Sequence, residues 1–126
     1  MTQSSVALQA SVALVVPCFE EAARLDRSAF IALVDKVPGL DLLFVDDGSR
    51  DRTLAILHAM AHERPVRIEV VALSKNQGKA EAVRQGLLRA LARPVSAVGF
   101  IGFIDADLST PPAEIQRLAQ DRKSVV

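Results

Sequence analysis

Four short apolar runs alternate along the chain with segments whose apolar residues recur at helical spacing. The runs lie at residues 12–16, 42–45, 66–73 and 98–104, and each has the length of a β-strand. Strands that are apolar on both faces are typical of parallel sheets covered by helices. The sequence therefore predicts an α/β, Rossmann-like fold, with a mainly parallel sheet flanked by helices and right-handed connections.

The intervening segments carry apolar stripes that predict helices. The stripes consist of Phe30, Leu33, Val34 and Val37; Leu54, Leu57 and Met60 or Ala61; and Val83, Leu87 and Ala90 or Leu91. Pro38, Pro65 and Pro94 follow the three stripes, and each marks a helix end because proline cannot continue a helix. A fourth helix is expected to begin at Pro111, with the Thr110 side chain capping it.

Composition narrows the class of protein. The 126 residues are 50% hydrophobic, which favours one domain with a substantial core. The formal net charge is zero, so a nucleic-acid-binding surface is not expected. A single cysteine excludes an internal disulfide and favours a cytoplasmic location. We expect residues 1–10 to be disordered, and residues 121–126 to be a non-native tail because they break the helical pattern.

Polar side chains follow each of the four predicted strands. These strand tips are residues 17–21, 46–51, 74–79 and 105–107. In an open parallel sheet, ligands bind at the carboxyl ends of the strands. We therefore expect the four tips to meet at one edge of the sheet and to form a binding site.

The last tip carries a pair of acids around Ala106. Asp105 and Asp107 come directly after a buried strand, and carboxylate oxygens at this density suit Mg²⁺ or Mn²⁺. A divalent cation would remove the repulsion between the two carboxylates and would neutralise a bound diphosphate. Asp105 and Asp107 are the predicted metal ligands.

Two other tips predict contacts to a nucleotide. Asp46 and Asp47 precede Gly48, and an ionised carboxylate can accept a hydrogen bond from a base N–H. Gly48 allows a left-handed turn, and Ser49 is a candidate cap for the next helix. Lys79 stands at a helix start, where its charge and the free backbone N–H groups of residues 76–79 favour a phosphate.

These four motifs resemble the GT-A fold glycosyltransferases of family 2, especially the polyprenyl-phosphate sugar transferases. The resemblance covers residues 13–118, nearly the whole predicted domain. Its segments are Val15-Val16-Pro17-Cys18-Phe19 with Glu21; Val45-Asp46-Asp47-Gly48-Ser49 with Asp51 and Thr53; Asn76, Gly78, Lys79, Ala82, Val83, Arg84 and Gly86-Leu87; and Asp105-Ala106-Asp107-Leu108-Ser109-Thr110-Pro111-Pro112. The chain departs from the family at Glu20, where the family usually has asparagine.

The resemblance implies a role for each matching residue. Pro17, Phe19 and Glu21 would line a nucleoside pocket; Asp47, with Asp46, would contact the base; Lys79 would lie near the donor phosphates; Asp105 would contact the ribose or the metal; and Asp107 would ligate the metal. Residues 11–120 would then be the nucleotide-sugar-binding half of a GT-A glycosyltransferase domain, truncated after the Asp-x-Asp motif.

The resemblance also implies a reaction. It is the inverting transfer of a hexose from a nucleoside diphosphate sugar to a polyprenyl phosphate, with Mg²⁺ or Mn²⁺, at the cytoplasmic face of the membrane. The ending Leu108 to Pro112 resembles glucosyl-type members, which favours UDP-glucose. A lipid phosphate is already ionised and needs no strong base, whereas a sugar hydroxyl would need a carboxylate base.

Any general base is expected downstream of the matched region. Two alternatives stay open: a non-catalytic nucleotide-binding fragment, and a family 2 transferase that acts on a saccharide acceptor. For the 126-residue chain itself we expect weak nucleotide binding and little or no turnover.

Overall fold

The computed structural model describes residues 12–93 and 99–120. Its elements, in chain order, are β1 (Val12–Cys18), α2 (Arg27–Lys36), β2 (Leu40–Asp46), α3 (Thr53–Glu63), β3 (Ile68–Ala72), α4 (Lys79–Leu91), β4 (Phe100–Phe103) and α5 (Pro112–Gln120). The predicted alternation of strands and helices is confirmed. The predictions for residues 1–10, 98 and 121–126 lie outside the described residues.

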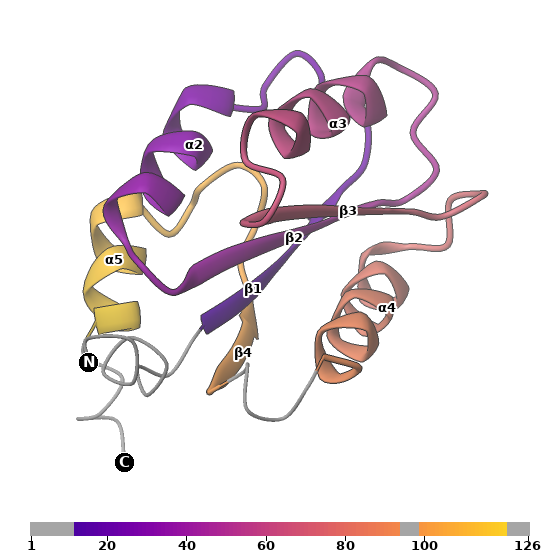
Figure 1. Cartoon of the computed structure of the whole chain (residues 1–126). Coiled ribbons are helices and arrows are strands. Elements are labelled where there is room, and N and C mark those ends of the chain that lie inside the picture. The colour runs from indigo at the N-terminus through magenta and orange to yellow at the C-terminus, as the bar shows by residue number, and fades with distance from the viewer. Residues whose placement is uncertain (1–11, 94–98, 121–126) are drawn as a thin grey trace.

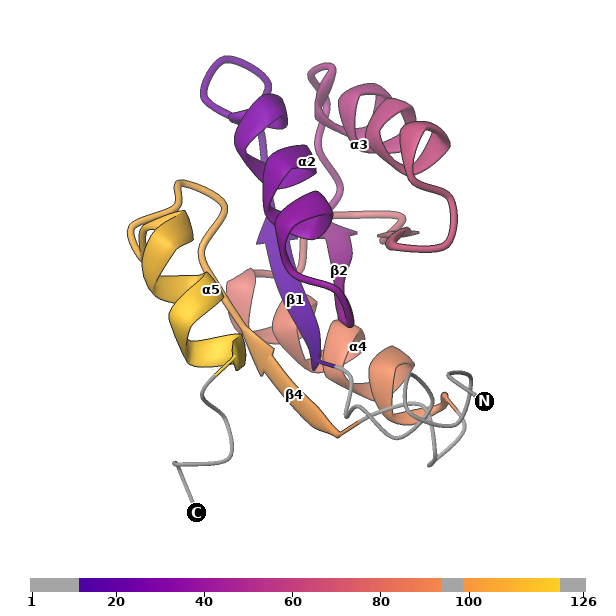
Figure 2. The ribbon, with the colours of Figure 1, turned by 60° about the vertical axis from the view of Figure 1, so that its left-hand side comes forward.

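The four described strands form one parallel sheet in the order β3-β2-β1-β4. Helices α2, α3 and α5 cover one face and α4 covers the other (Figure 1). Figure 2 shows α5 beside α2 on the shared face. The architecture is the predicted Rossmann-like arrangement of a parallel sheet flanked by helices. None of the described helices is long and apolar enough to cross a membrane.

Alternate residues of the central strands supply two cores. Leu14 and Val16 face the larger core under α2, α3 and α5, and Val15 faces the smaller one under α4. In the larger core the rings of Phe30 and Phe44 meet edge to face, with centroids 5.1 Å apart and planes at 82°. Because β1 is buried along its whole length, the loop that follows it starts from a fixed position.

Helix α4 lies closer to the sheet than its apolar stripe predicts. The buried residues on it are Ala82, Gly86 and Ala90. Ala90 was expected to be buried, but the alternative, Leu91, is 67% exposed. A Cβ on Gly86 would lie 2.4 Å from Val15 Cγ1. Small residues therefore face the sheet, while the larger Val83 and Leu87 are only partly buried.

Strand β1 continues through Pro17 to Cys18, although the predicted strand ends at residue 16. The Ile104 amide donates to the Val15 oxygen, toward β4. The Asp47 amide donates to the Cys18 oxygen, toward β2. The backbone groups of successive β1 residues thus point alternately toward β4 and toward β2, so the Pro17 nitrogen faces β4. The pairing of β4 with β1 ends opposite Val15. The missing N–H of Pro17 therefore removes no ladder bond.

Other element boundaries also differ from prediction by a few residues, and two of these differences have a clear physical reason. Val66 is 85% exposed, and β3 begins only at Ile68, because residues 64–67 form a turn closed by backbone hydrogen bonds. The last helix begins at Pro112 rather than Pro111. The Pro111 carbonyl accepts its first two helical bonds, so Pro111, and not Thr110, stands at the cap position.

Candidate functional site

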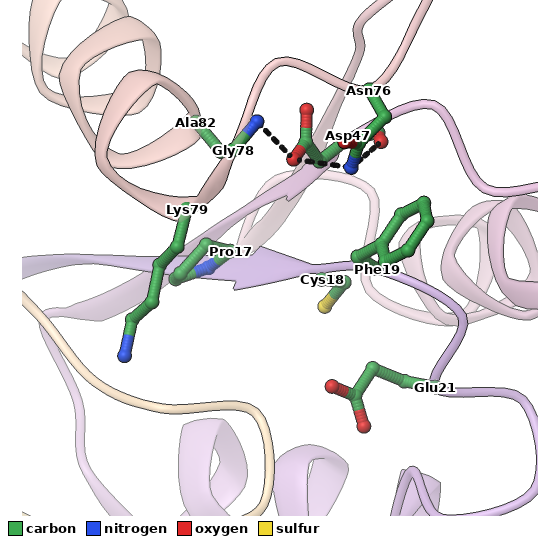
Figure 3. Close-up of a pocket in the computed structure, with 9 residues that line it drawn as sticks. All are labelled: Pro17, Cys18, Phe19, Glu21, Asp47, Asn76, Gly78, Lys79 and Ala82. Carbon is green, nitrogen blue, oxygen red and sulfur yellow. Dashed lines mark hydrogen bonds between the residues drawn. The ribbon is translucent and has the colours of Figure 1, made fainter.

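A pocket of about 340 Å³ opens where β1, β2 and α4 meet the loops that follow the strands (Figure 3). It is lined by Pro17, Cys18, Phe19, Glu21, Asp47, Asn76, Gly78, Lys79 and Ala82. Three of the four predicted tips therefore share one pocket. Among the predicted site residues, the pocket brings together Pro17, Phe19, Glu21, Asp47 and Lys79 and leaves out Asp46, Asp105 and Asp107.

Asp47 is the most highly bonded side chain of this pocket. It is 2% exposed, and its Oδ1 accepts from Gln77 N at 2.8 Å. Its Oδ2 accepts from Gly78 N at 2.9 Å and from Asn76 Nδ2 at 2.9 Å (Figure 3). A carboxylate has about four acceptor positions, so one position remains on Oδ1.

These bonds correct one expectation from the sequence. The amides of Gln77 and Gly78 were expected to be free for a phosphate, but both donate to Asp47. The protein's own carboxylate is thus the anion that they bind. Of the features at this helix start, Lys79 lines the pocket, where its ammonium group pairs with Asp105.

Asp46 is buried behind the pocket rather than in it. It is 2% exposed, its Oδ2 accepts from Ser49 N at 3.2 Å, and its Oδ1 has no hydrogen-bond partner among the described residues. Its register partner is Cys18. Burial, Glu21 and Asp46 together raise the pKa of the Cys18 thiol, so this cysteine stays protonated and is no nucleophile.

Ser49 does not cap α3 as expected. The helix begins four residues later at Thr53, and Arg52 at the cap position makes no side-chain cap bond. The Ser49 Oγ instead accepts from Glu20 N at 2.9 Å. Its hydroxyl therefore joins two loops, a contact that no local sequence pattern reveals.

Glu20 has a backbone conformation that is unfavourable for a glutamate. Its φ is 52°, in the left-handed region that costs an L-residue about 1–2 kcal/mol and that asparagine tolerates better than most. Asparagine is also the residue that the family resemblance leads us to expect at this position. The local backbone gives a physical reason for that preference.

Glu20→Asn is expected to raise the free energy of unfolding by about 0.5–1 kcal/mol, because asparagine relieves part of this strain. Urea titration followed by circular dichroism measures the change. Glu20→Gln is the control for charge, since it removes the same charge without the tolerance of a left-handed backbone. Glutamine keeps a side-chain oxygen within reach of Arg50 N, whereas the shorter asparagine gives up this exposed bond, so the gain from asparagine is a lower bound on the strain that it relieves. An equal gain from both variants would assign the effect to charge.

The acids around Ala106 point away from the core. Ala106 is buried, whereas the side chains of Asp105 and Asp107 are exposed. Asp105 Oδ1 pairs with Lys79 Nζ, and its Oδ2 accepts from Ser109 Oγ at 3.3 Å. The hydrogen bond from Lys79 holds the pKa of Asp105 below its ordinary value. The fourth tip is thus joined to the pocket through Lys79.

The donor set of this fourth tip fits a shared cation rather than a closed metal site. Within residues 12–93 and 99–120, no group of three or more His, Cys, Asp or Glu side chains gathers to hold a metal. Asp105 and Asp107 supply two carboxylates. Mg²⁺ commonly binds proteins through one or two carboxylates plus substrate phosphates. The pair therefore fits a cation that a diphosphate also ligates, once Asp105 releases Lys79.

Comparison with known proteins places the chain in a family. Residues 13–122 match the profile of glycosyl transferase family 2, and the chain belongs to this family. It is 32% identical over 112 residues to an undecaprenyl-phosphate 4-deoxy-4-formamido-L-arabinose transferase of Pseudomonas aeruginosa. That match covers 86% of this chain and 31% of the relative, so the chain spans about a third of such relatives.

Solved structures support the fold assignment. A mycobacterial protein superposes with a TM-score of 0.61 at 23% identity, over 95% of this chain and 39% of its own. A mannosyltransferase of Pyrobaculum calidifontis, solved with GDP-mannose and Mn²⁺, superposes with a TM-score of 0.52 at 23% identity, over 62% of this chain and 24% of its own. Both share the GT-A arrangement of strands and helices.

Proposed function

We propose that the chain is the nucleotide-sugar-binding half of an inverting glycosyltransferase. The whole protein transfers a hexose, with UDP-glucose the favoured donor, to a polyprenyl phosphate at the cytoplasmic face of the membrane. The observation that carries this proposal is the pocket itself. It combines an exposed aromatic ring, a buried acceptor carboxylate and a lysine, and this lysine pairs with the first of two outward-facing acids.

The part of the pocket formed by Phe19 and Asp47 suits a uracil base. The Phe19 ring is 42% exposed on the pocket wall and offers a surface for stacking. The free acceptor position of Asp47 lies on an oxygen that already binds one amide, so it takes one further N–H. Uracil presents one ring N–H, whereas cytosine presents an acceptor at the same position. The contacts therefore favour UDP over CDP.

The part of the pocket formed by Lys79 suits a diphosphate. Lys79 lines the pocket and pairs with Asp105. Both side chains of this pair are largely exposed, so the pair is weak and easily exchanged. On nucleotide binding, Lys79 would move to the phosphates, and Asp105 and Asp107 would hold Mg²⁺ or Mn²⁺. The bound cation would supply neutralisation of the departing diphosphate.

The acceptor is inferred from the relatives. The Pseudomonas relative is named for transfer to undecaprenyl phosphate, which is a polyprenyl phosphate. Such an acceptor carries its own negative charge, so attack needs no strong base from the protein. A saccharide acceptor would instead require a carboxylate base near the sugar, and the described pocket offers Glu21 as its only carboxylate besides the hydrogen-bonded Asp47.

Calorimetric titration of the chain with UDP, GDP and CDP, each with and without Mn²⁺, tests this proposal. UDP is expected to bind about tenfold more tightly than CDP, because N3 of cytosine is an acceptor and its base would have to shift before the exocyclic amine could donate to Asp47. Mn²⁺ is expected to tighten UDP binding. Equal affinities for UDP and CDP would contradict the base contact, and no binding of any nucleotide with Mn²⁺ would contradict the donor-site assignment.

A further inference from the structure

The loop after β1 is tied to the segment after β2 by a ladder of side-chain hydrogen bonds. Three consecutive amides donate to three alternate residues: Glu20 N to Ser49 Oγ at 2.9 Å, Glu21 N to Thr53 Oγ1 at 2.8 Å, and Ala22 N to Asp51 Oδ2 at 3.3 Å. Arg50 N returns one bond to Glu20 Oε2 at 3.2 Å. Two segments about thirty residues apart in sequence are thus joined, residue by residue.

Thr53 is the buried centre of this ladder. The residue is 0% exposed, and its hydroxyl both accepts from Glu21 N and donates to Asp51 Oδ1. Asp51 Oδ1 also accepts from Thr53 N at 2.9 Å. These bonds from Thr53 hold the pKa of Asp51 below its ordinary value. Asp51 therefore stays ionised and accepts the hydroxyl hydrogen of Thr53, which leaves the hydroxyl oxygen to accept from Glu21 N.

The ladder acts on the pocket without lining it. Phe19 and Glu21 line the pocket, whereas Ser49, Asp51 and Thr53 do not. The amides that the ladder binds belong to Glu21 and to its two neighbours. The left-handed φ of Glu20 lies in the same stretch, so this backbone turn is held by tertiary hydrogen bonds rather than by local preference.

We propose that Ser49, Asp51 and Thr53 are positioning residues that fix the backbone of residues 20–22 and thereby aim Phe19 and Glu21 at the nucleoside. This inference rests on the proposed function, since it names the groups that prepare the donor pocket for its base. It gives the residues after the Asp-Asp-Gly turn a role separate from helix capping and from contact with the nucleotide.

Thr53→Val removes the hydroxyl at nearly constant volume and is the first test. UDP is expected to bind about two- to twelvefold more weakly in the presence of Mn²⁺, the loss that corresponds to one net hydrogen bond. Hydrogen exchange followed by NMR gives a second readout. Exchange at the Glu21 amide is expected to accelerate, whereas exchange at the Asp47 amide, bonded to Cys18 within the sheet, is expected to stay slow.

Two further variants separate positioning from general stability. Thr53→Ser keeps the hydroxyl and is expected to restore both UDP affinity and protection of Glu21. Leu57→Val shortens a fully buried side chain on the same helix and is expected to lower the melting temperature without weakening UDP binding. If Thr53→Val does not fold, Ser49→Ala, read at the Glu20 amide and by UDP affinity, takes its place.

The proposal would be overturned if the Thr53→Val variant lost stability but kept its UDP affinity. It would also be overturned if hydrogen exchange at the Glu21 amide were unchanged. A different result would contradict the proposed function. If the unaltered chain binds no nucleotide while Glu21 exchange still depends on the Thr53 hydroxyl, the ladder stands as a backbone clamp and the nucleoside assignment of the pocket is wrong.

Discussion

Asp47→Ala is expected to lower the free energy of unfolding by about 2–4 kcal/mol and to abolish detectable UDP binding. The carboxylate binds three donors from residues 76–78, and a hydrogen bond to a charged group contributes about 1.5–3 kcal/mol. The total is smaller than three such bonds, because the loop is largely exposed and water can replace part of the loss. Urea unfolding followed by circular dichroism is the measurement, since the chain has no Trp or Tyr.

Asp35→Ala is the matched control for this prediction. Asp35 makes an exposed two-point ion pair with Arg64, with both contacts at 2.8 Å. Exposed pairs contribute about 0–1 kcal/mol, and a two-point pair lies near the top of that range. The same chemical change at Asp35 should therefore lower the free energy of unfolding by no more than the top of that range and should leave UDP binding unaltered. Equal stability losses in the two variants would show that the loop does not depend on Asp47.

Asp107→Ala is expected to remove the Mn²⁺ dependence of UDP binding while the melting temperature stays nearly constant. Asp107 is exposed and its carboxylate accepts one described bond, from Ser109 N at 2.9 Å, so its loss has little effect on folding. Loss of a residue that only hydrogen-bonds to a metal ligand typically weakens metal binding about 10–100-fold. Asp107 would bind the metal directly, so its loss is expected to weaken metal binding by more than that. Titration of Mn²⁺ into the UDP-saturated chain measures the effect.

Glu114→Ala serves as the control for charge, because Glu114 is an exposed carboxylate in the first turn of the following helix. It should leave the Mn²⁺ dependence intact. Retention of that dependence in Asp107→Ala would remove Asp107 from the metal site and would leave Asp105 as the remaining candidate ligand of the described acid pair.

The sequence predicts the order and type of every described element because each strand is apolar and each helix has a stripe or a proline boundary. The predictions are wrong at positions where tertiary contacts determine the local structure. Pro17 continues β1 because its neighbouring strand has already ended. The buried stripe of α4 consists of small residues because the helix packs tightly on the sheet. Neither circumstance leaves a local pattern in the chain.

The candidate site is predicted less completely. The convergence of strand tips follows from the topology, which brings Phe19, Asp47 and Lys79 together. The sequence does not show which of two adjacent acids enters the pocket, and the alternation of β2 turns Asp46 into the protein while Asp47 follows the strand end. The bonds of Ser49 and Thr53 to the loop after β1 join distant segments, so they become visible only in the folded chain.

The tight crossing of α4 over β1 and β2 links a remote position to the pocket. Gly86 lies against Val15 and Val45, with no room for even one additional carbon. It is about two helical turns, roughly 10 Å, from Lys79 at the start of the same rigid helix. A bulkier residue there would act as a wedge and would tilt the lysine away from the phosphate end. For the proposed donor site, an evolutionary change in affinity can therefore arise beneath the helix, without replacement of any residue that lines the pocket.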